Sequence, residues 1–187
     1  ITDHINIRGY NDLEKINKTE YKYYIVNATT FYKIFKYSDK RISNIFEFSN
    51  EIKINSSKLL SEDIDEYISL HLRLGDKFLE TDKKYVFVKN DTRKYNIDNI
   101  NRYIEDNKDN NIIFFCDNNK FKKELKERHK NIIILESKIG HTSFTNTKEE
   151  QVLDTITEFY IMTKSKIIVS ASLSGFSIVA SKFNNTK

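Results

Sequence analysis

Two side chains that could hold an anion stand close together in residues 66–78, with a glycine turn and an aspartate after them. His71 and Arg73 are two positions apart, and Asp76 follows directly after Gly75. A guanidinium presents a planar fork of N–H donors that matches phosphate oxygens, and an imidazole adds a short, adjustable donor. The spacing therefore favours an anion-binding site. The simpler alternative is a solvated strand face, or an ion pair without a ligand.

The element that positions His71 and Arg73 is predicted to be a strand over residues 67–73. Apolar side chains at Ile68 and at every second position after it alternate with polar ones, which is the two-residue period of a strand. Gly75 ends this pattern. Because ligands of open α/β sheets bind at the carboxyl ends of the strands, we expect a binding site where this strand ends.

Strands and helices alternate along the rest of the chain. We expect further strands over residues 23–28, 85–88, 112–116, 132–135 and 166–170, and helices over residues 57–64, 96–107, 120–130, 148–164 and 175–183. In the helix over 148–164, Thr147 and Glu150 are expected to form a capping box. Its core-facing side chains are expected to be Val152, Leu153, Ile156, Phe159, Tyr160 and Thr163. The alternation predicts an α/β fold, a Rossmann-like parallel sheet with helices on both faces.

Polar groups follow four of these strands, and in a parallel sheet the carboxyl ends of the strands meet at one edge. Besides His71 and its neighbours they are Asp117, the loop over residues 136–147, and the serine-rich segment 170–177. In that segment the amides at the start of a helix, with the hydroxyls of Ser172 and Ser174, could bind an anion. The alternative is that Ser174 serves only as a helix N-cap.

Two carboxylates four residues apart, Asp154 and Glu158, are expected off the apolar face of their helix. Such a pair is usually just solvated. The functional alternative is recognition of a guanine base, because a carboxylate accepts hydrogen bonds from its N1–H and its exocyclic amine.

The composition disfavours several classes of function. The net charge of +4 is spread over interspersed acids and bases, and no nucleic-acid-binding motif is present, so we expect no nucleic-acid partner. Cys116 is the single cysteine, which excludes an internal disulfide, fits the cytoplasm or another reducing compartment, and predicts a buried thiol. No apolar run could span a membrane. Metal-ligand spacing and the glycine-rich nucleotide motifs are also missing.

The His-Leu-Arg-Leu-Gly-Asp run that begins at His71 resembles the His-x-Arg-x-Gly-Asp signature of the α1,2-, α1,6- and protein-O-fucosyltransferase superfamily. The later pieces follow in the family's order. An apolar strand ends at Asp117, where the family often has an acidic pair, and a helix carrying Asp154 leads to the segment 170–177, which is similar to the family's third motif. The likeness spans about residues 45–183 and is greatest to the bacterial α1,2 type.

This resemblance implies the nucleotide-sugar-binding half of a GT-B glycosyltransferase. Residues 1–50 would be an amino-terminal arm or a reduced acceptor-side segment, and residues 51–187 the donor-binding domain. The implied reaction is inverting transfer of fucose from GDP-fucose to a hydroxyl of a glycan or protein acceptor, with no metal or other cofactor required. Two alternatives remain: a non-catalytic nucleotide-sugar-binding module of the same fold, and a transferase that uses another nucleotide sugar. The acceptor, the linkage and the oligomeric state stay open.

The family's roles can be carried over to matching positions of this sequence. Arg73 would bind the donor phosphate and stabilise the departing diphosphate. Asp76 is the carboxylate nearest the motif and a candidate catalytic residue, although it alternatively only locks the turn with Gly75. The other residues expected at the donor are His71 against the nucleotide, Ser172 and Ser174 at the phosphates with Gly175 and Ser177 beside them, Asp154 at guanine, and Asp117 at the fucose or ribose.

Overall fold

The computed structural model describes residues 43, 46–60, 64–75, 94–140 and 147–183. All of them belong to the unit Ile42–Lys187. The strands expected over residues 23–28 and 85–88 lie outside the described residues, as does Asp76.

Four parallel strands form one sheet in the order β3-β2-β1-β4. They are β1 (Ile68–Leu72), β2 (Ile112–Cys116), β3 (Ile132–Ile134) and β4 (Ile167–Ser170). The strand that carries His71 is paired on both sides, since Ile68 lies opposite Ile112 of β2 and Ile167 of β4. The predicted Rossmann-like α/β sheet is therefore confirmed, with β1 inside it.

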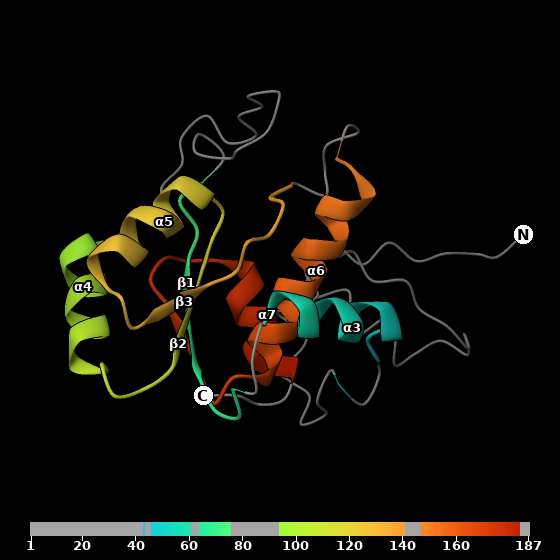
Figure 1. The fold of residues 1–187 in the computed structure, drawn as a ribbon, viewed down its shortest axis with the longest axis horizontal. Helices are drawn as coiled ribbons and strands as arrows, with labels where there is room; N and C mark the ends of the chain where they lie inside the picture. The colour runs from blue at the N-terminus through green and yellow to red at the C-terminus, as the bar shows by residue number, and fades with distance from the viewer. Residues whose placement is uncertain (1–42, 44–45, 61–63, 76–93, 141–146, 184–187) are drawn as a thin grey trace, which may run out of the picture. The chain divides into compact units, whose positions relative to one another are not determined.

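Helices cover both faces of the sheet (Figure 1). On one face lie α4 (Ile97–Asp106) and α5 (Asn119–Arg128), and on the other α3 (Asn50–Leu59), α6 (Glu149–Lys164) and α7 (Gly175–Phe183). The sheet thus separates two apolar cores. The first includes Leu70, Leu72, Ile104, Phe114 and Leu125, and the second Tyr67, Ile113, Phe115, Ile161, Met162 and Ala180.

Both faces of the two middle strands are buried. Every residue of β1 and of β2 is buried, including the polar Ser69 and His71. A solvated strand face, the simpler explanation of the His-x-Arg spacing, is therefore excluded. Burial of both faces is expected of parallel strands with helices on either side.

Asparagine caps the amino-terminal ends of both helices on the first face of the sheet, α4 and α5. The side chain of Asn96 accepts from the amides of Asp98 and Asn99, and that of Asn118 accepts from the amide of Phe121. The predicted α4, α5 and α7 are confirmed within about two residues at each end.

Two helix predictions are wrong in detail. The first helix was expected over residues 57–64 but is Asn50–Leu59, because Ser49 accepts a hydrogen bond from the amide of Ile52 and caps it there. The start of α6 is also displaced by one residue. Gln151, rather than Glu150, accepts from a backbone amide, that of Lys148.

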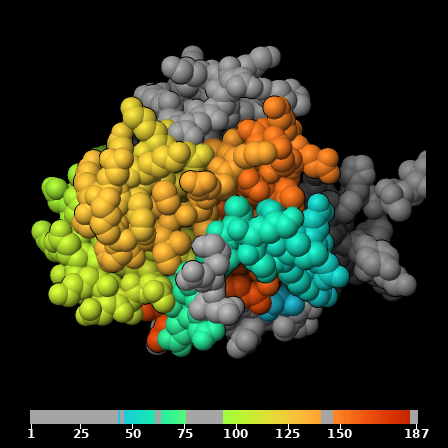
Figure 2. Space-filling model, viewed as in Figure 1, coloured from blue at the N-terminus to red at the C-terminus, as the bar shows by residue number. Residues whose placement is uncertain are grey.

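The core-facing side of α6 is confirmed only in part. Thr163 is buried and Phe159 packs against the second core, as expected, whereas Ile156 is exposed and Thr157, Ile161 and Met162 are buried instead. Thr157 lies on the side of α6 against which α3 packs, and its Oγ1 accepts a hydrogen bond from Asn55 Nδ2 at 3.0 Å. Figure 2 shows α3 in cyan against α6 in orange, in front of parts of α7 in red. α6 is therefore covered both by the sheet, at Ile161 and Met162, and by α3, at Thr157.

Candidate functional site

The carboxyl ends of β1 and β4 are joined by a reciprocal pair of hydrogen bonds. The amide of Arg73 donates to Ser172 Oγ at 2.8 Å, and this hydroxyl donates to the carbonyl oxygen of Arg73 at 3.1 Å. The amide of Ala171 adds a third bond, to the carbonyl oxygen of His71. Two segments 99 residues apart in sequence therefore lie side by side at one edge of the sheet.

Asp117 organises the turn after β1. Its carboxylate accepts from the amides of Leu74 at 2.7 Å and Gly75 at 3.1 Å, and lies 3.0 Å from Arg73 Nη1. Gly75 has a φ of 114°, in the left-handed region that disfavours any side chain. Asp117 thus holds the turn closed and orients the guanidinium, which keeps 19% of its side-chain surface exposed.

His71 is buried, and this burial, together with the nearby charges of Arg73 and Lys122, lowers the pKa of its imidazole from 6.5 to about 4, so the ring is neutral at pH 7. Its ring centre lies 5.6 Å from that of Phe176, and its buried Nδ1 has no hydrogen-bond partner among the described residues. At neutral pH this side chain can offer a ligand a hydrogen bond but not a positive charge.

The start of α7 combines both expected roles of Ser174. Its hydroxyl accepts from the amide of Phe176 at 3.3 Å, so it acts as a cap, and it also lines a cavity. Gly175 is the exposed first residue of the helix. Ser177 is buried, with its hydroxyl 2.9 Å from that of Ser170. The amino-terminal end of α7, where the helix dipole favours anions, therefore borders the cavity.

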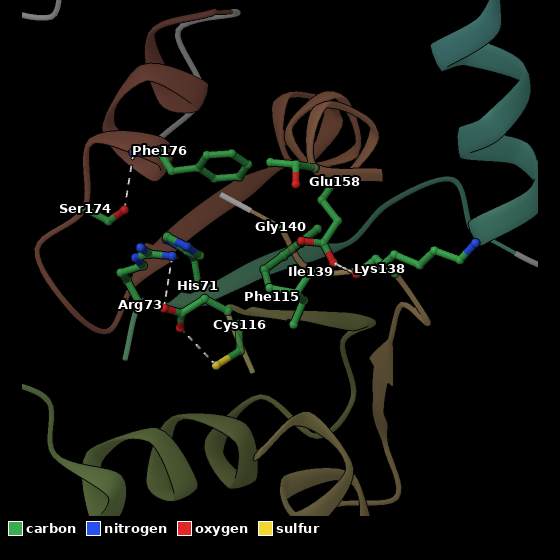
Figure 3. Close-up of a pocket in the computed structure, with 13 residues that line it drawn as sticks. His71, Arg73, Phe115, Cys116, Lys138, Ile139, Gly140, Glu158, Ser174 and Phe176 are labelled. Carbon is green, nitrogen blue, oxygen red and sulfur yellow. Dashed lines mark hydrogen bonds and ion pairs between the residues drawn. The ribbon is translucent and has the colours of Figure 1, made fainter. Parts of the chain in front are cut away.

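A cavity of about 220 Å³ opens at this edge of the sheet (Figure 3). Its walls come from the ends of β1 and β2, the segment after β3, one side of α6 and the start of α7. They are formed by His71, Arg73, Phe115, Cys116, Asp117, Ser137, Lys138, Ile139, Gly140, Thr155, Glu158, Ser174 and Phe176. Figure 3 shows Ser174 and Phe176 on one side and Glu158 on the other.

The cavity brings together some of the predicted site residues. His71, Arg73, Asp117 and Ser174 line it. Ser172, Gly175, Ser177 and Asp154 do not; Ser172 and Ser177 hold the surrounding backbone through the hydrogen bonds given above. Asp76 lies outside the described residues.

Asp154 is engaged in a structural role. Its carboxylate accepts from Asn55 Nδ2 of α3 at 3.1 Å and from the amide of Lys138 at 2.7 Å. It therefore ties the segment after β3, and α3, to α6. Gly140 lies close against α6, since a Cβ there would come within 2.6 Å of Gln151 Cβ.

The most deeply buried charge near the site was missed from the sequence. Lys122 of α5 is buried, and its Nζ lies 2.7 Å from Glu158 Oε1 and 3.0 Å from Ser137 Oγ. Ser137 in turn donates to the same oxygen of Glu158. A signal was available, because Lys122 stands three positions before the buried Leu125 on the apolar side of α5.

Cys116 is buried, as predicted, and burial raises the pKa of its thiol, so it is protonated and unsuited to nucleophilic attack. Within the described part of the chain, no three or more His, Cys, Asp or Glu side chains are placed to bind a metal ion together. Nor does any helix there have the length and apolar character needed to cross a membrane.

No protein-family model matches the sequence, and no curated protein matches it. The residues of the site and the motif that begins at His71 are therefore the features of this chain that bear on its function.

Proposed function

We propose that this protein binds a nucleoside diphosphate sugar, in the first instance GDP-fucose, and transfers the sugar to a hydroxyl of a glycan or protein acceptor. Its domain would correspond to the nucleotide-sugar-binding half of a GT-B glycosyltransferase. The observation that carries the proposal is the reciprocal hydrogen bonding of Arg73 and Ser172. It places His71 and Arg73 from one segment, and the start of α7 from the other, around one cavity.

The residues of the cavity suit a diphosphate and the groups on either side of it. The guanidinium of Arg73, held by Asp117, and the amino-terminal end of α7 offer donors and positive charge to phosphate oxygens. Neutral His71 adds a donor. Breaking the bond from sugar to phosphate leaves negative charge on the diphosphate, and Arg73 would stabilise that charge where it develops.

Binding without transfer is the second candidate, and a specific observation favours it. The two carboxylates that line the cavity, Asp117 and Glu158, are each paired with a cation, Arg73 and Lys122. Both carboxylates are thus already engaged in ion pairs within the cavity wall. The neutral imidazole of His71 could accept a proton from an acceptor hydroxyl, but its pKa, lowered to about 4 by burial, makes it a weak base.

The first test is calorimetric titration of the protein with GDP, GDP-fucose, UDP and ADP, beside Arg73→Ala and Arg73→Lys. We expect selective binding of the guanine nucleotides, weakened at least tenfold, about 1.4 kcal/mol, by Arg73→Ala. Arg73→Lys should restore part of the affinity, since it keeps the charge but not the planar fork. The exposed Arg128 at the end of α5 supplies the control variant, Arg128→Ala.

No binding of any nucleotide by the folded wild-type protein would refute the proposal. If GDP-fucose binds, release of GDP is then measured with and without a mixture of glycan and peptide acceptors. Release that depends on the acceptor supports transfer, and tight binding without release supports the non-catalytic alternative.

A further inference from the structure

Glu158 presents a fixed carboxylate oxygen to the cavity. Its Oε1 accepts hydrogen bonds from Lys122 and Ser137, whereas its Oε2 accepts none from any described residue. The side chain is 13% exposed, and Figure 3 shows it extending from α6 toward the cavity, which Ile139 and Gly140 also line. One oxygen is thus anchored and the other is available to a ligand.

Lys122 decides what kind of group that oxygen can hold. Its ammonium group is buried and lies 2.7 Å from Glu158 Oε1, with the carbonyl oxygen of Leu135 as a third, weaker acceptor at 3.4 Å. The pair is neutral as a whole. A cationic ligand at Oε2 would be attracted by the carboxylate but repelled by the ammonium directly behind it. A neutral N–H or O–H donor gains a charge-assisted hydrogen bond without that repulsion.

The opposite side of the cavity offers hydrogen-bond donors, whereas Glu158 offers an acceptor. Arg73, His71 and the start of α7 offer donors there, while Phe115 and Phe176 supply apolar surface between. A ligand that satisfies both sides carries an anionic group at one end and neutral hydrogen-bond donors at the other.

We infer that Glu158 is a specificity-determining residue of this site, which accepts a hydrogen bond from a neutral N–H or O–H group of the bound ligand through Oε2. Lys122 and Ser137 are positioning residues that fix the carboxylate. The inference rests on the proposed function for the identity of the anionic end. The donor group comes either from the edge of the base or from a hydroxyl of the sugar. Asp154, the other carboxylate considered for guanine recognition, already accepts hydrogen bonds from Asn55 Nδ2 and from the amide of Lys138.

The experiment compares three ligands by calorimetry: inorganic pyrophosphate, GDP and GDP-fucose. Pyrophosphate has only the anionic part, so its affinity reports on the Arg73 side of the cavity alone. The variants are Glu158→Gln and the double variant Glu158→Gln with Lys122→Met. In the double variant no buried lysine is left without its partner, so it keeps the test valid if the single variant does not fold. Glu149→Gln, at an exposed position of the same helix, is the matched control.

We expect pyrophosphate affinity to change less than about twofold in all variants, because the anionic end is untouched. Both Glu158 variants should bind GDP-fucose roughly tenfold more weakly, the usual cost of losing a hydrogen bond to a charged group. If the base supplies the donor, GDP weakens equally; if the sugar does, only GDP-fucose weakens.

Equal losses for pyrophosphate and for GDP-fucose would overturn the inference, since they would mean that Glu158 only supports the fold. Unchanged affinity for all three ligands would overturn it as well. Neither result affects the proposed function, which fails instead if the wild-type protein binds none of the three ligands, and the inference then fails with it.

Discussion

Asp117→Asn tests how the turn after β1 is held. The carboxylate has two backbone amide donors, from Leu74 and Gly75, and the guanidinium of Arg73, and its side chain is only 7% exposed. Asparagine keeps one acceptor oxygen, so it can satisfy one amide but leaves the other unpaired and removes the ion pair. Hydrogen bonds to charged groups contribute about 1.5–3 kcal/mol each. We therefore expect the free energy of unfolding to fall by about 3 kcal/mol.

Urea denaturation followed by circular dichroism measures this change. With a slope of about 2 kcal/mol per molar urea, the midpoint should fall by about 1.5 M. The control is Asp109→Asn, an exposed aspartate in the turn after α4, which should stay within about 0.5 kcal/mol of wild type. If Asp117→Asn behaves like this control, the three contacts do not stabilise the turn and the reasoning about the site is wrong.

Two further predictions concern the neighbours of Asp117. Because the pKa of His71 is lowered from 6.5 to about 4, the unfolded chain binds a proton at a higher pH than the folded one. Stability should therefore fall by up to about 3 kcal/mol as the pH drops from 6.5 to 4, and be unaffected by this group above 6.5. Urea midpoints across this range measure the effect, and an equally steep fall in His71→Gln would contradict it. Ser172→Ala should lower the free energy of unfolding by about 1–2 kcal/mol, because the amide of Arg73 loses its acceptor. Thermal denaturation measures this beside Ser57→Ala, an exposed control. Equal midpoints for the two variants would show that the hydrogen bonds between Arg73 and Ser172 do not stabilise the fold.

Patterns within short segments were enough to predict much of the fold. The continuous apolar run Ile112–Cys116 is typical of a strand covered on both faces, and Ile97, Ile100 and Ile104 recur at helical spacing in α4. Both signals arise from neighbours in the chain. The same holds for the turn at Gly75, whose positive φ agrees with the glycine found there. The convergence of His71, Arg73 and Ser174 followed from the general rule that carboxyl ends of parallel strands meet at one edge.

Contacts between distant segments were not predictable in the same way. Lys122 and Glu158 are 36 residues apart, and each looks like an ordinary surface charge on its own helix. Only the packing of both helices past the end of β3 buries them together. The core-facing side of α6 was predicted only in part for a similar reason, since the contact of α3 with Thr157 is not visible in the sequence of α6 alone.

The pairing of Lys122 with Glu158 has a consequence for how the protein opens. The sheet keeps the two apolar cores apart, and this ion pair joins a helix of one core to a helix of the other. Layers held only by their own cores can unfold separately, as independent cooperative units. At this edge, α5 cannot separate from the sheet without leaving the buried carboxylate of Glu158 on α6 without its ammonium partner. Local opening of either helix layer therefore breaks the same ion pair, which couples the residues that line the cavity to the unfolding of both layers.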